Sequence, residues 1–162
     1  MALTGDNTRN FEDMLRMIPD ADGQISVSDY TDVDALLFAE IAGIDIENLA
    51  GPYSNAFQYN GDGTVSYYAN ESFTLPELIK LYENAYDEEA LQSNDKYRLL
   101  KAMSESPRYK DITFNGFADS KDQTYWDEQG NEYTANYKAV TVEVPDGKII
   151  SYAGTGSSIF GW

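Results

Sequence analysis

The end of the last predicted hairpin has the residues best suited to chemistry. A mainly apolar strand at residues 148–153 leads into a run of small residues: Gly154, Thr155, Gly156, Ser157 and Ser158. Small residues at a strand end leave backbone N–H groups exposed and let a ligand approach closely. Such donors can stabilise the negative charge that develops on a carbonyl oxygen, as an oxyanion hole does. From the pattern alone, a terminal segment without a ligand is the more common explanation.

Part of the spacing of an EF-hand calcium loop occurs in residues 20–29, which read DADGQISVSD. If Gly23 is the sixth residue of such a loop, Asp20, Asp22 and Asp29 take its third, fifth and twelfth positions. The first position then falls on an isoleucine, and the twelfth lacks the usual bidentate Glu. Turns closed by Asp side chains explain the pattern better. We therefore predict no metal site and keep the three aspartates only as candidate Ca²⁺ ligands.

Other acidic or aromatic patterns provide weaker evidence for a functional site. The loop NGDGTVS at residues 60–66 has Gln58 and Ala69 at the first and twelfth positions of the same spacing. A pair of carboxylates for glycoside hydrolysis is conceivable among 28 acids, but no pair is singled out by its position. The 13 tyrosines fit half-buried packing better than a sugar-binding surface. We predict no cofactor.

Composition excludes several kinds of chemistry within these 162 residues. There is no His, so no Ser-His-Asp triad and no His metal site can form. There is no Cys, so no disulfide, zinc-thiolate cluster or thiol nucleophile can form. The net charge of −17 and the pI near 4.1 argue against binding of nucleic acid through its phosphates, which requires clustered Lys and Arg.

The acidic excess lies mainly in the first half of the chain. Half of the 28 acids but only two bases, Arg9 and Arg16, lie in residues 1–79. A solvated surface is the simpler interpretation, and a cation site or a face that imitates a polyanion is the alternative. No apolar run approaches a membrane span, and the N-terminus lacks the pattern of a signal peptide. These features, with the lack of Cys, predict a cytoplasmic protein.

The periodicity of apolar residues predicts the helices and strands that position the candidate site residues. Apolar residues at helical spacing predict helices at about 8–18, 32–42, 75–85 and 95–104. Thr31 and Thr74 are their clearest N-caps, each with an acid three residues later. Residues 50–72, with their Gly, Pro and Asn, are expected to be loop.

After Pro107 the period shortens towards two. Alternation predicts strands at about 111–118, 137–144 and 149–153, and Pro145-Asp146-Gly147-Lys148 predicts a hairpin turn between the last two. Residues 119–131 are expected to be a polar connection. The prediction is one α+β domain over 1–162, helical over 1–106 and antiparallel β over 107–162.

Residues 139–162, AVTVEVPDGKIISYAGTGSSIFGW, resemble a lipase-like α/β-hydrolase family of bacterial proteins related to class 3 lipases. In that family a Pro-Asp-Gly hairpin leads into a strand ending Phe-Arg-Gly-Thr, then a polar run and Gly-Trp. The segments DYTDVDALLFAE at 29–40, TLPEL at 74–78 and SESPRYKDI at 104–112 resemble the family more loosely. The resemblance implies a partial α/β-hydrolase fold.

The same resemblance implies site residues. Thr155 matches the family's Thr, so its backbone N–H, with its hydroxyl, is expected to help form the oxyanion hole, and Gly154 permits the turn. Ala153 stands where the family usually has Arg. The family's nucleophile elbow, acid and His lie further along, and Gly156–Gly161 lacks the elbow spacing. We therefore expect the N-terminal part of an ester- or lipid-hydrolysing enzyme, without triad-dependent activity of its own.

Two functional hypotheses follow. A piece of a serine hydrolase predicts antiparallel strands at 111–153 packed against the helices, and an apolar sheet edge that favours self-association. A separate acidic binding module, an inhibitor or adaptor that presents residues 12–47, predicts a closed monomer with a continuous negative surface and no open sheet edge.

Overall fold

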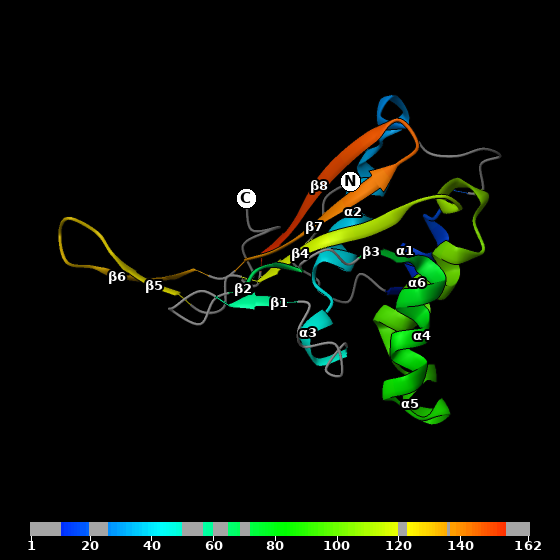
Figure 1. The fold of residues 1–162 in the computed structure, drawn as a ribbon, viewed down its shortest axis with the longest axis horizontal. Helices are drawn as coiled ribbons and strands as arrows, with labels where there is room; N and C mark the ends of the chain where they lie inside the picture. The colour runs from blue at the N-terminus through cyan, green and yellow to red at the C-terminus, as the bar shows by residue number, and fades with distance from the viewer. Residues whose placement is uncertain are drawn as a thin grey trace.

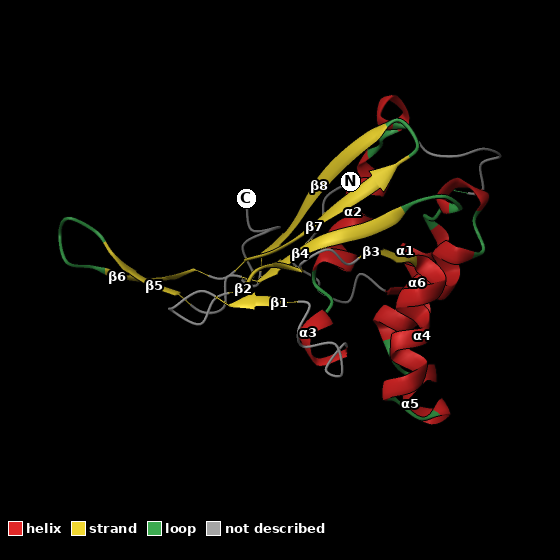
Figure 2. Cartoon of the chain, in the orientation of Figure 1, coloured by secondary structure: helices red, strands yellow, loops and turns green. Residues whose placement is uncertain are grey.

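The computed structural model describes residues 11–19, 26–49, 57–59, 65–68, 72–119, 123–135 and 137–154, and Figure 1 follows the chain through them. The fold is α+β, as predicted: helices lie against an antiparallel sheet, and a separate hairpin extends away from both (Figure 2). The partial α/β-hydrolase fold that the resemblance implies requires further strands beside this antiparallel sheet.

The four predicted helices are present. They are α1 (Phe11–Arg16), α2 (Asp32–Ala42), α4 (Leu75–Ala85) and α6 (Asp95–Ser104), joined by shorter α3 (Ile46–Leu49), α5 (Glu88–Gln92) and the 3₁₀ turns Val27–Asp29 and Pro107–Tyr109. Both predicted N-caps form capping boxes, in which a Thr hydroxyl accepts from the backbone three residues later and the acid there accepts from the Thr N–H. These caps fix where α2 and α4 begin.

Six antiparallel strands form the main sheet. They are β1 (Phe57–Tyr59), β2 (Val65–Tyr68), β3 (Ser72–Thr74), β4 (Thr113–Asp119), β7 (Tyr137–Val144) and β8 (Gly147–Gly154). The spatial order is β1-β2-β4-β7-β8, and β3 pairs with β4 beside β2. The predicted hairpin between β7 and β8 is confirmed, with pairs running from Tyr137↔Gly154 to Val144↔Gly147. Among the described strands, β8 is therefore at one edge of the sheet.

The structure differs from the sequence prediction in two places. Residues 50–72, expected to be loop within a helical half, contain β1, β2 and the start of β3. The polar connection at 119–131 contains part of a hairpin made by β5 (Gln123–Trp126) and β6 (Glu132–Ala135), which pair only with each other. Strands of three or four residues give too few alternations for periodicity to detect them.

The core lies between α2 and the sheet and continues towards α4 and α6. Leu37, Phe38 and Ile41 of α2 are fully buried, and α2 packs against β7 and β8. Phe38 makes edge-to-face contacts with Tyr109 and Phe114. In the part of the chain that the structure describes, no helix has both the length and the hydropathy to cross a bilayer.

Candidate functional site

The predicted oxyanion segment begins where β8 ends. Gly154 is the last residue of β8, and its Cα partner is Tyr137 at the start of β7. The regular β7–β8 pairing carries the strand from the turn at Pro145-Asp146 to this end without a register shift. The structure thus places Gly154 at a strand end, as predicted, whereas Thr155 lies outside the described residues.

Ala153, which stands where the resembling family has Arg, faces the C-terminal end of α2. A Cβ built on Gly43, just after α2, would lie 3.8 Å from the Ala153 Cβ and 3.3 Å from the Lys96 Nζ. Lys96 comes from α6, and its Nζ donates to the Glu40 carbonyl at 2.8 Å and to the Glu40 carboxylate at 2.5 Å. A cation therefore lies next to the end of β8, although it is supplied by a helix rather than by the strand.

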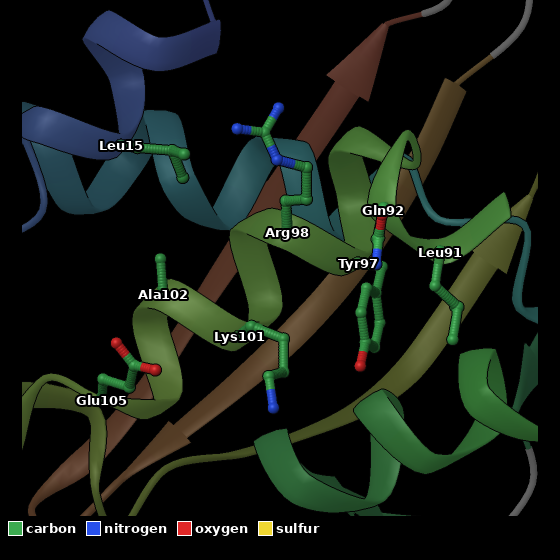
Figure 3. Close-up of a pocket in the computed structure, with 8 residues that line it drawn as sticks. All are labelled: Leu15, Leu91, Gln92, Tyr97, Arg98, Lys101, Ala102 and Glu105. Carbon is green, nitrogen blue, oxygen red and sulfur yellow. The ribbon is translucent and has the colours of Figure 1, made fainter. Parts of the chain in front are cut away.

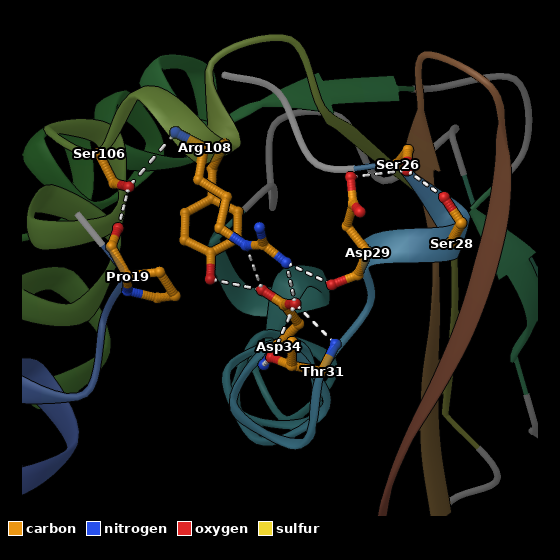
Figure 4. Close-up of polar contacts among 9 residues, drawn as sticks. Pro19, Ser26, Ser28, Asp29, Thr31, Asp34, Ser106 and Arg108 are labelled. Carbon is orange, nitrogen blue, oxygen red and sulfur yellow. Dashed lines mark hydrogen bonds and ion pairs between the residues drawn. The ribbon is translucent and has the colours of Figure 1, made fainter. Parts of the chain in front are cut away.

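A buried polar cluster joins α2 to the turn after α6 (Figure 4). Asp34 is fully buried, and its carboxylate accepts from Arg108 Nε at 3.0 Å, Arg108 Nη2 at 2.5 Å and Tyr109 Oη at 2.7 Å. The Thr31 backbone N–H and hydroxyl also donate to this carboxylate, at 2.9 and 3.0 Å. Every charge in the cluster thus has a hydrogen-bonded counterpart, which buried charges need.

The pKa values in the cluster follow from these contacts. Burial alone would raise the pKa of Asp34, but the hydrogen bonds from Arg108, Tyr109 and Thr31 outweigh it and lower that pKa. The hydrogen bond that Arg108 donates to Asp34 raises the pKa of Arg108, although burial of the guanidinium acts in the opposite direction. Burial and the hydrogen bond to Asp34 raise the pKa of Tyr109. Asp34 and Arg108 are thus held charged and Tyr109 neutral, in an arrangement without a reactive group.

The cluster also fixes two loops. Arg108 Nη2 donates to the Asp29 carbonyl at 2.8 Å, and the Ser106 hydroxyl donates to the Pro19 carbonyl at 2.6 Å. These bonds hold the chain after α1 and the chain before α2 against the turn after α6 (Figure 4). The cluster therefore explains how distant segments are positioned, and we assign it a structural role.

A shallow groove lies between α1, α5 and α6 (Figure 3). Its volume is about 380 Å³, and its residues are Leu15, Leu91, Gln92, Tyr97, Arg98, Lys101, Ala102 and Glu105. Arg98 lies over the Phe11 ring and pairs with Glu12 and, at 3.7 Å, with Asp95. This groove was not predicted, because its lining comes from three helices, and the periodicity of apolar residues does not determine how those helices pack together.

The structure adds no support for the candidate calcium ligands. Asp29 lies in the 3₁₀ turn Val27–Asp29, where its carboxylate accepts from the Ser26 hydroxyl at 2.9 Å. Asp20 and Asp22 lie outside the described residues. Within the described ranges, no three acidic side chains come close enough together to hold a metal ion.

Comparison of the chain with protein-family models, with curated proteins and with solved structures gives no match.

Proposed function

We propose that this chain is the N-terminal part of a lipase- or esterase-like serine hydrolase and that it supplies an oxyanion-hole donor. The observation that carries the proposal is the position of β8, an edge strand of the described sheet that ends at Gly154, directly before the matched Thr155. An edge strand can be extended by further strands on its other side. The proposed hydrolase needs such strands, because they would bring the nucleophile towards the end of β8.

The proposed chemistry divides between this chain and the rest of the enzyme. A serine oxygen, deprotonated by a histidine, attacks the carbonyl carbon of an ester, and the carbonyl oxygen takes up the negative charge. The backbone N–H of Thr155 is proposed to donate to that oxygen. The serine, the histidine and their acid must come from another segment, because this chain has no His. The substrate class is an ester or a lipid.

The neighbourhood of Ala153 also supports the proposal. An Arg side chain at position 153 of this chain would begin beside the end of α2, close to Glu40. In this chain Lys96 pairs with Glu40 at the same place. The Glu40 carboxylate therefore has a cationic partner although residue 153 is Ala. The replacement of the family's Arg by Ala is for this reason compatible with the proposed function.

The decisive experiment uses the full reading frame that contains these residues. The proposal predicts an in-frame Gly-x-Ser-x-Gly and a His after Trp162, and hydrolysis of p-nitrophenyl esters by the full-length protein. Thr155→Pro, which removes the backbone N–H, should lower kcat by about 10²–10³-fold, as loss of one oxyanion donor does. Thr155→Ser keeps both the N–H and a hydroxyl and is the matched control. A reading frame without these motifs, or equal kcat for both variants, would contradict the proposal.

The acidic binding module has less structural support. It needs a continuous negative surface over residues 12–47, yet several acids there are engaged with bases. Asp34 is buried against Arg108, and Glu12 and Glu40 pair with Arg98 and Lys96. Among the described strands β8 is also at an edge, whereas this hypothesis predicts no open sheet edge.

A further inference from the structure

We infer that β8 is a self-association edge, at which two copies of this chain pair antiparallel about a two-fold axis and form one continuous sheet. The inference develops the self-association that the hydrolase hypothesis predicts for the open sheet edge. Its test is separate from that of the proposed function, because it concerns residues 147–154 and needs no downstream segment. The occupant of the edge is a second copy of the same chain.

The geometry of β8 suits pairing. It has eight residues in unbroken register with β7, whereas β4 pairs with β7 through a register shift between Asn115 and Ala118. Proteins protect edge strands with prolines, bulges, charges or very short length. Strand β8 contains no Pro, shows no register shift against β7 and has one charged residue, Lys148, near its start. The opposite edge of the sheet, β1, has only three residues.

Charge favours this edge over other surfaces for contact between two copies. The protein carries a net charge of −17, so most of its surfaces would bring carboxylates together in a dimer. Residues 147–154 contain no acid. Lys148 pairs with Glu143 on β7 at 3.2 Å, so its charge is partly neutralised. Antiparallel pairing of two β8 strands therefore places no two carboxylates opposite each other.

The side chains of β8 alternate in a way that suits a two-fold axis. Ser151 is buried, and Ile149 and Ala153 pack against the core, so these residues face α2. Ile150 lies on the other face and is 61% exposed. When an antiparallel pair is centred on Ile150, the two Ile150 side chains lie opposite each other on the same face, and Lys148 lies opposite Tyr152 of the other copy. This register buries an apolar side chain that each copy alone exposes.

Sedimentation velocity over a range of protein concentrations tests the inference. The wild-type chain should change from monomer to dimer as its concentration rises. Higher salt should strengthen the dimer, because it screens the repulsion between two chains of net charge −17. Ile150→Lys should raise the dimer dissociation constant roughly 100-fold, since each copy loses a buried apolar contact and gains a charge at the edge.

The matched control is Trp126→Lys, which places the same charge on another exposed apolar residue, in the β5–β6 hairpin. This variant should dimerise as the wild type does. Far-ultraviolet circular dichroism establishes that both variants are folded. A wild-type chain that stays monomeric at all concentrations and salt levels would overturn the inference. Equal weakening by both variants, or an unaffected Ile150→Lys, would also overturn it.

The dimer and the proposed function can fail independently of each other. The self-association experiment uses residues 1–162 alone, and the hydrolase experiment reads kcat in the full reading frame. If both ideas hold, a downstream segment that adds strands to β8 should compete with the second copy and dissociate the dimer. A monomeric chain with an active full-length enzyme would refute only the dimer.

Discussion

Arg108 and Asp34, 74 residues apart in the sequence, form a two-pronged ion pair in the protein interior, with Nε–Oδ1 and Nη2–Oδ2 distances of 3.0 and 2.5 Å. Asp34 is in the first turn of α2, and Arg108 is in the 3₁₀ turn that precedes β4. The pair therefore connects the helix that covers the sheet with the point at which the chain enters the sheet. Its geometry leads to the first two predictions.

Arg108→Met should lower the free energy of unfolding by about 3–5 kcal/mol, because it leaves the Asp34 carboxylate buried without its cation. Urea denaturation at neutral pH measures the change. Lys80→Met is the matched control, since Lys80 is exposed on α4, and it should change stability by about 0.5 kcal/mol or less. A loss for Arg108→Met no larger than the control's would show that the pair does not hold the fold together.

The stability contribution of Asp34 should depend on pH in the acid range. The folded-state pKa of Asp34 is lowered, so its contribution is fully present above the unfolded pKa of about 4 and is lost as pH falls through the folded pKa. The stability difference between the wild type and Asp34→Asn should therefore shrink as the pH falls below about 4. Urea denaturation of both proteins over a pH series tests this, and a constant difference would refute it.

Gly116→Ala should lower the free energy of unfolding by about 1–2 kcal/mol. Gly116 has a φ of +59°, within the register shift of β4, and an added Cβ would lie 3.2 Å from the Thr141 Oγ1. Gly116→Asn should cost less than Gly116→Ala, because Asn adopts positive φ more readily. If thermal denaturation shows equal loss for the two variants, crowding at Thr141 rather than backbone conformation sets the cost.

A cation at position 153 of β8 should be able to replace Lys96 of α6 as the partner of Glu40. Lys96→Met should cost about 0.5–1 kcal/mol, because the Lys96–Glu40 pair is about one-third exposed. Adding Ala153→Arg should recover part of this loss, since residue 153 and Lys96 approach the same point beside Gly43. The double variant and both single variants form a thermodynamic cycle. Additive effects would show that residue 153 does not reach Glu40.

The β5–β6 hairpin should open far more often than β7–β8. Its strands pair only with each other, and an isolated two-stranded ribbon is marginally stable in water. Strands β7 and β8 belong to the main sheet and pack against α2. Hydrogen exchange should thus show little protection of amides at 123–135 and strong protection at 139–144. Equal protection of both segments would contradict this.

The sequence predicted elements that carry their own local signals. The capping boxes at Thr31 and Thr74 and the helical spacing after them identified α2 and α4, and the Pro145–Lys148 turn identified the β7–β8 hairpin. The short strands β1, β2 and β3 were missed. Strands β2 and β3 pair with β4, which lies far along the chain, and β1 pairs with the nearby β2 but has three residues, too few for periodicity to detect.

The candidate site was predictable to a similar degree. The strand end at Gly154 followed from local alternation. The cation beside it did not, because Lys96 reaches Glu40 across 56 residues and no local pattern links the two. The Asp34–Arg108 pair was missed for the same reason, although both residues lie in segments that the resemblance covers.

The packing of α2 against β7 and β8 has a consequence for protein synthesis. Leu37, Phe38 and Ile41 leave the ribosome about 100 residues before the strands that they pack against. The apolar face of α2 is therefore fully covered only when residues up to 154 have emerged. A chain that ends before β8 would leave part of this face exposed, so truncation within residues 137–154 should promote aggregation.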